Sequence, residues 1–88
     1  MLFTYGYVKN GMLENHLNTR YNLMKSFTYS DYVDSYYINP DSTLIVFNEM
    51  NNSSSYSTII YFAATKEKIQ HILSEADGVA LFSWILNW

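Results

Sequence analysis

The chain has 88 residues, which is enough for one small domain with a modest hydrophobic core. It contains no cysteine, and this excludes a disulfide framework, thiolate metal sites and a cysteine nucleophile. The net charge is −3, and the five basic residues are too few and too dispersed along the sequence to form a nucleic-acid-binding stripe.

The predicted elements begin with a strand over residues 1–8, where β-forming residues alternate loosely with other types. Residues 12–27 carry apolar side chains at helical spacing and predict an amphipathic helix. Residues 29–38 predict an edge strand, and the turn sequence Asn-Pro-Asp-Ser at 39–42 follows it.

The second half of the chain predicts a hairpin and then a helix. Residues 43–49 and 56–64 are apolar runs typical of buried strands, joined by a polar loop at 51–55. Thr65 is placed to cap the helix that follows, and Gly78 stands where a left-handed C-cap is expected.

The tail from Val79 is expected to be a last strand or a second helix packed on the sheet. The order is therefore β-α-β-β-β-α-tail. It predicts a single α+β domain over residues 1–88, with two helices packed on a small mixed sheet or partial barrel.

The ends of the chain bear on its location. Residues 1–8 lack the basic and apolar regions of a signal peptide, and the apolar run VALFSWILNW is too short to span a bilayer. We expect a cytoplasmic protein with no membrane partner and no nucleic-acid partner. Abundant Asn, Ser, Tyr and Ile are typical of AT-rich genomes, and so of a viral or low-GC bacterial source.

Two segments carry a family-like pattern. The first, LFTYGYVKNG at residues 2–11, is an apolar strand with a Tyr-Gly pair, a lysine and a second glycine, and an Asn-His pair follows at 15–16. The second is a strand, IYFA at residues 60–63, with LSEADGV at 73–79 after it. Together they resemble the γ-glutamylcyclotransferase-like family, which includes the AIG2-like proteins.

The resemblance implies a small mixed β-barrel with flanking helices, and a carboxylate ligand held by backbone N–H groups in the loop after the first strand. It also implies a general acid–base carboxylate that helps release 5-oxoproline from a γ-glutamyl amine. Asp77 stands at the position of the family's catalytic glutamate, one methylene shorter. The ligand-binding residues implied are Tyr5, Gly6, Tyr7, Val8, Lys9 and Gly11.

The same residues admit structural interpretations. Gly6 and Gly11 fit a bend in the strand and the entry to a helix. Asp77 before Gly78 fits a helix C-terminus, where its charge opposes the helix dipole. The two histidines show no metal-ligand spacing, so we expect no metal and no cofactor.

The aromatic residues suggest a second class of function, because nine tyrosines are many for this length. They fit a solvated sheet face stabilised by cross-strand pairs, or a protein-binding surface. The apolar tail likewise either completes the core or forms an interface, and a two-fold homodimer is one expected outcome. The interface candidates are Tyr29, Tyr32, Tyr36, Tyr37, Trp84 and Trp88.

Two functions therefore follow from the sequence. One is a cyclotransferase-like protein that binds a γ-glutamyl or other small carboxylate ligand, with or without residual activity. The alternative is a non-enzymatic, phage-encoded inhibitor or adaptor that binds a host protein such as a CRISPR effector or another defence enzyme.

Overall fold

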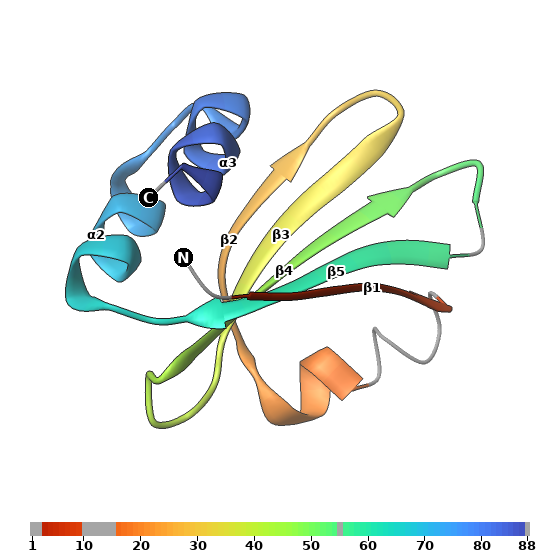
Figure 1. The fold of residues 1–88 in the computed structure, drawn as a ribbon. Helices are drawn as coiled ribbons and strands as arrows, with labels where there is room; N and C mark the ends of the chain where they lie inside the picture. The colour runs from red at the N-terminus through yellow and green to blue at the C-terminus, as the bar shows by residue number, and fades with distance from the viewer. Residues whose placement is uncertain (1–2, 10–15, 55, 88) are drawn as a thin grey trace.

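The computed structural model describes residues 3–9, 16–54 and 56–87, and Figure 1 shows them as an antiparallel sheet with helices packed beside it. The sheet has five strands in the order β1-β5-β4-β3-β2. The strands are β1 (Phe3–Lys9), β2 (Asn22–Thr28), β3 (Tyr32–Ile38), β4 (Leu44–Asn51) and β5 (Tyr56–Ala63). The helices α2 (Lys66–Ser74) and α3 (Gly78–Leu86) follow, and residues 16–20 are also helical.

The α+β class is confirmed, with one correction to the sheet. Each of the pairings β1–β5, β5–β4, β4–β3 and β3–β2 is antiparallel, so the prediction of a mixed sheet is wrong for these strands. The sheet also stays open, because β1 and β2 lie at its two edges and are not paired with each other. In Figure 1 the two edge strands lie at opposite sides of the twisted sheet.

The single helix predicted over residues 12–27 is wrong in its second half, where the chain forms β2. Met24 and Phe27 both pack toward the core from this strand although they are three residues apart. That spacing is helical, but a register shift between Leu23 and Lys25 explains it. A bulge inserts one extra residue into a strand, so side chains three apart can reach the same face.

The strand predicted over residues 29–38 exists as β3, but it is not an edge strand. β3 lies between β2 and β4, and β2 takes the edge instead. The turn predicted at 39–42 is confirmed, because the Asn39 side-chain oxygen accepts hydrogen bonds from the backbone N–H groups of Thr43 and Leu44, both at 2.9 Å.

The predicted hairpin over residues 43–64 is confirmed as β4 paired with β5. These strands read as apolar runs because both of their faces are covered. Ile45 and Phe47 face α2 and α3, while Val46 faces the opposite side and packs with Leu17. The main core lies between the sheet and the two helices; its buried members are Tyr36, Ile45, Phe47, Ile60, Phe62, Ile72, Leu81 and Ile85.

The start of α2 agrees with the prediction, but the role predicted for Gly78 does not. Thr65 caps α2 as expected, and its hydroxyl accepts a hydrogen bond from the Lys68 N–H at 3.2 Å. Gly78 is not a C-cap, because α2 has already ended and Gly78 is the first residue of α3. The tail is therefore a helix. Among the residues that the structure describes, no helix is long and apolar enough to cross a membrane.

Gly78 allows α3 to approach β2 closely. A β-carbon built at this buried position would lie 2.7 Å from Cγ of Phe27 and would overlap the hydroxyl of Tyr29. We expect Gly78→Ala to lower the free energy of unfolding by about 1–3 kcal/mol through overpacking. Helix propensity alone predicts the opposite sign, since alanine is favoured over glycine by about 1 kcal/mol.

Urea denaturation of Gly78→Ala measures this difference. Val79→Ala is the matched control, since Val79 is the next residue of α3 and is 63% exposed. A Gly78→Ala protein as stable as the wild type would show that α3 does not need the close approach.

Candidate functional site

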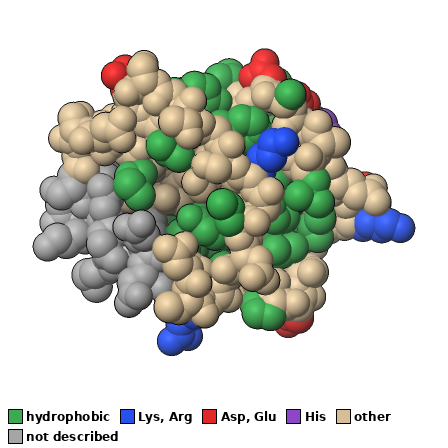
Figure 2. Space-filling model, turned by 180° about the vertical axis from the view of Figure 1, so that it is seen from behind, with side chains coloured by type: hydrophobic (Ala, Val, Ile, Leu, Met, Phe, Trp, Pro, Cys, Tyr) green, Lys and Arg blue, Asp and Glu red, His purple; other side chains and the backbone are tan. Residues whose placement is uncertain are grey.

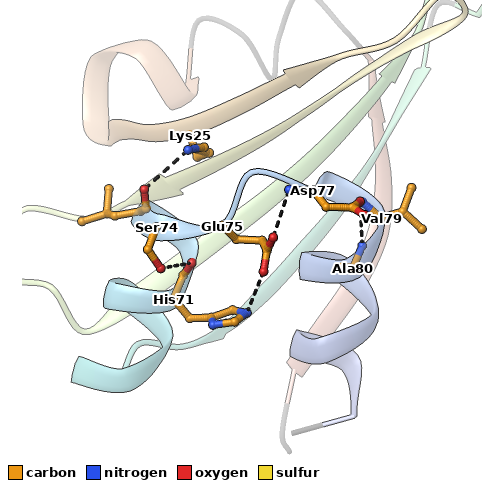
Figure 3. Close-up of polar contacts among 8 residues, drawn as sticks. Lys25, His71, Ser74, Glu75, Asp77, Val79 and Ala80 are labelled. Carbon is orange, nitrogen blue, oxygen red and sulfur yellow. Dashed lines mark hydrogen bonds and ion pairs between the residues drawn. The ribbon is translucent and has the colours of Figure 1, made fainter.

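Asp77 lies at the start of α3 and acts as its N-cap (Figure 3). Its carboxylate oxygen Oδ1 accepts hydrogen bonds from the N–H groups of Val79 at 3.0 Å and Ala80 at 3.2 Å. The expectation that Asp77 ends a helix and opposes its dipole is therefore wrong. The negative charge faces the positive end of α3, and it stabilises the helix.

The segment before Asp77 links the two helices. The Glu75 side chain accepts a hydrogen bond from the Asp77 N–H at 3.0 Å, and its other oxygen lies 3.6 Å from Nε2 of His71. His71 stacks on Trp84 of α3 with ring centroids 3.9 Å apart. This chain of contacts, drawn in part in Figure 3, fixes how α3 follows α2. It gives Asp77 a structural role.

The residues expected to hold a carboxylate ligand lie mostly within a strand. Tyr5, Gly6, Tyr7, Val8 and Lys9 all belong to β1 and pair with Ile60 to Tyr56 of β5, so the strand predicted over residues 1–8 extends to Lys9. A carboxylate site at these residues stays a prediction. Gly11 lies outside the described residues. The parts of the chain that the structure describes enclose no pocket.

The tyrosines expected on a surface are divided between core and surface. Tyr36 is fully buried in the main core, where its ring lies 5.0 Å from that of Phe47. Tyr29 and Tyr32 stack on each other with centroids 4.6 Å apart. Tyr37 is half-buried and packs against the second, smaller cluster.

Of the two tryptophans predicted to form an interface, the structure describes only Trp84. Trp84 is half-buried and packs against the main core while it stacks on His71, so part of its ring serves helix packing. Trp88 lies outside the residues that the structure describes.

A pair of carboxyl groups that the sequence does not predict, one buried and one half-buried, lies on the sheet face that carries α2 and α3. Asp34 of β3 stands directly opposite Glu49 of β4, and Asp34 is only 5% exposed. Burial, together with a side-chain hydrogen bond to Glu49 and the charge of Glu49, raises the pKa of Asp34 to about 7. The pair therefore favours a state that holds one shared proton.

Two tyrosine hydroxyl groups lie beside this carboxyl pair. Burial, and then the charge of Asp34, raise the pKa of both Tyr36 and Tyr29. Both hydroxyl groups and Oδ1 of Asp34 are buried, and among the described residues they have no hydrogen-bond partner. Unsatisfied buried polar atoms are costly, and their grouping marks this place as functionally unusual. Only the register of β3 on β4 reveals the pair, since Asp34 and Glu49 are distant in sequence.

The outer edge of β2 is a third feature of the described surface. Among the described strands, β2 pairs with β3 alone, and Lys25 at this edge donates a hydrogen bond from Nζ to the Leu73 carbonyl of α2 at 3.4 Å (Figure 3). Leu23 and Leu73 are 57% and 53% exposed. Leu23 pairs with Tyr37, on the sheet face away from the helices, so exposed leucines lie near this edge on both sides of the sheet.

Figure 2 shows the molecule from behind. Hydrophobic side chains on that face form several groups separated by polar atoms, with a Lys or Arg side chain among them. They do not form one continuous apolar area there. A large flat hydrophobic interface is therefore less well supported on that face than contact at a sheet edge.

Comparison of the chain with family models, with curated proteins and with solved structures finds no match. The resemblance to the cyclotransferase-like family stays a prediction from the residues. Within the described ranges, no three His, Asp or Glu side chains are grouped as a metal site requires.

The capping role of Asp77 can be separated from any catalytic role. We expect Asp77→Ala to lower the free energy of unfolding by about 1 kcal/mol, and Asp77→Asn to lower it less, because asparagine also caps helices. Thermal unfolding followed by circular dichroism measures both variants. Equal stability of Asp77→Ala and the wild type would contradict the cap.

Proposed function

We propose that the protein acts by binding another protein, and that an extended segment of the partner pairs with the free edge of β2. The observation that carries the proposal is a strand edge that no other described strand pairs with, with an exposed leucine near it on each side of the sheet. Strand addition of this kind is a recurrent mode of peptide recognition, in which backbone hydrogen bonds supply affinity and alternate side chains supply specificity.

The backbone of β2 has donors and acceptors available. The Tyr29 N–H bonds to the Tyr32 carbonyl at 2.9 Å, which makes these two residues a hydrogen-bonded pair next to the hairpin turn. Hydrogen-bonded and non-hydrogen-bonded pairs alternate along an antiparallel ladder. Ser26 and Thr28 therefore point their backbone N–H and C=O groups away from β3, toward a partner strand.

The surroundings of the edge limit what fits there. The bulge between Leu23 and Lys25 interrupts the regular ladder, so pairing is confined to the short stretch from Lys25 to Thr28. The ammonium of Lys25 lies at the same edge, where it favours an acidic residue in the partner segment. We infer a short extended ligand with apolar side chains directed to Leu23 and Leu73 and a carboxylate directed to Lys25.

This mode of action fits an inhibitor or adaptor. A protein that adds a strand to its own sheet can occupy a segment of the target without any chemistry, as expected of a phage-encoded protein that blocks a host defence enzyme. The alternative, cyclotransferase-like activity at Asp77, stays a prediction, and release of 5-oxoproline from γ-glutamyl amines tests it directly. The Asp77 carboxylate already accepts two backbone hydrogen bonds, which favours the binding function.

The test uses a displayed library of random 12-residue peptides selected on the whole protein. We expect selected peptides to shift the amide resonances of β2 and of the end of α2. Ser26→Pro should weaken their binding about tenfold or more, because it removes the outward N–H at a position where β3 needs no donor.

Ser26→Ala is the matched control, since it removes the hydroxyl but keeps the N–H, and it should bind as the wild type does. Peptides that map to other elements, or that bind Ser26→Pro equally well, would contradict the proposal. Light scattering on the protein alone tests whether a second copy of the same chain occupies the β2 edge. A dimer disrupted by Ser26→Pro would show that the edge pairs with a second copy and not with a partner protein.

A further inference from the structure

The carboxyl pair of β3 and β4 has no function in the proposed binding mode, yet its position is unusual. Asp34 is buried directly opposite Glu49, and none of the described Lys or Arg side chains forms an ion pair with either residue. Two like charges so close cannot both stay ionised without a large cost. Natural cores rarely keep such a pair unless it is neutralised.

The groups that face this pair come from each element packed around it. Tyr36 and Tyr32 belong to β3, Glu49 to β4, and Tyr29 to the turn after β2. Asp77 belongs to the start of α3, close enough for its charge to act on Tyr29. These groups are neutral or anionic. Lys25 of β2 also lies on this face, with its ammonium 5.8 Å from the centre of the Phe27 ring, but it donates to the Leu73 carbonyl and forms no ion pair with Asp34 or Glu49 among the described residues.

The start of α3 lies against the same tyrosines. The backbone at Gly78 approaches the hydroxyl of Tyr29 and the ring of Phe27, so no side chain fits between α3 and the end of the β2–β3 hairpin. Phe27 in turn contacts Tyr36 edge-to-face, with centroids 6.3 Å apart. Phe27 also stands directly opposite Asp34 in the register of β2 on β3, so Phe27, Tyr29 and Tyr36 form a layer that lies next to both Asp34 and the start of α3.

We propose that Asp34 and Glu49 form a proton-binding site that controls the docking of α3. When the pair holds its shared proton, the start of α3 is seated on Tyr29 and Phe27. When the proton leaves, the buried Asp34 carboxylate adds a negative charge next to Phe27 and the two tyrosines, on which the start of α3 and its Asp77 carboxylate are packed, and the start of α3 moves away.

The raised pKa of Asp34 determines how the stability of the docked state changes with pH. The folded state holds the proton up to about pH 7, while the unfolded chain loses it near the ordinary value of 3.8. The stabilisation from the bound proton is therefore complete below about pH 4 and is lost as the pH rises through 7. Water must enter to solvate the new charge, and the unsatisfied Oδ1 of Asp34 and the two hydroxyl groups are where it binds.

We expect only the start of α3 to move, because the other contacts of α3 do not involve the carboxyl pair. Leu81 and Ile85 are fully buried in the main core, and Phe82 packs on Phe47 with centroids 4.7 Å apart. β4 and β5 are covered on both faces and belong to the most protected part of the sheet.

The test is amide hydrogen exchange of the whole protein at pH 5.5 and pH 8, expressed as protection factors so that the intrinsic pH dependence is removed. In the wild type we expect protection in α3 to fall about tenfold or more between the two pH values, while β4 and β5 change less. Asp34→Asn keeps the shape and removes the charge, and its α3 should stay protected at pH 8.

Asp31→Asn is the matched control, because it removes one exposed carboxylate from the nearby hairpin turn, and it should behave as the wild type does. Carbon-13 titration of the carboxyl groups gives a second measurement and should show a proton retained on the pair above pH 6. The proposal is overturned if Asp34→Asn shows the same fall as the wild type. It is also overturned if α3 protection is constant with pH, or if β4 and β5 lose protection as much as α3 does.

Discussion

The antiparallel register of β3 on β4 is the constraint on which the other features of this structure depend. It places Tyr36 opposite Phe47, and these two rings form the centre of the core beneath α2 and α3. The same register places Asp34 opposite Glu49, two residues further along the same face. A shift of one residue would turn each side chain to the other face of the sheet. The apolar centre and the carboxyl pair therefore arise from one strand pairing.

The packing of α3 on the sheet also depends on this pairing, because aromatic residues next to the paired side chains contact α3. Phe27 of β2 and Tyr29 of the turn after it contact α3 at Gly78. The backbone comes close there because glycine has no side chain. Asp77 fixes the first turn of α3 at the same place, because its carboxylate binds two N–H groups there. The end of the β2–β3 hairpin and the start of α3 thus share one contact region, in which packing, capping and buried charge meet.

The sequence predicts those parts of the fold whose cause is local. The apolar runs of β4 and β5 and the turn at Asn39 were identifiable because strands covered on both faces read as continuous hydrophobic segments. The helix that begins after Thr65 was identifiable from its cap. β2 was not identifiable, since its bulge gives Met24 and Phe27 the three-residue spacing of a helix. Asp77 was assigned to the wrong end of a helix, because only the three residues 75–77 separate α2 from α3.

The carboxyl pair escaped prediction for a different reason. Asp34 and Glu49 are ordinary surface residue types, and nothing in the neighbouring sequence marks either as buried. Their meeting is a property of strand register and of the helices that cover that face, both of which are set by tertiary packing. The tyrosines were identified as a group but not resolved into core and surface. Tyr36 and Tyr37 are adjacent in a strand and therefore face opposite sides, which a count of tyrosines does not show.

The edge of β2 and the carboxyl pair also share residues, and this has a thermodynamic consequence. Among the described strands β2 pairs only with β3, and its Phe27 side chain contacts Tyr36 and the start of α3. A strand that pairs with the free edge holds Phe27 in place, and the bound proton of Asp34 holds the tyrosine layer next to it. If either event changes the free energy of the other, the effect must be equal in both directions, because linkage between two binding equilibria is reciprocal. A partner that binds the protonated form more tightly than the deprotonated form must therefore raise the proton affinity of the pair by the ratio of these two partner affinities. A partner whose binding is independent of pH must leave the carboxyl titration unchanged.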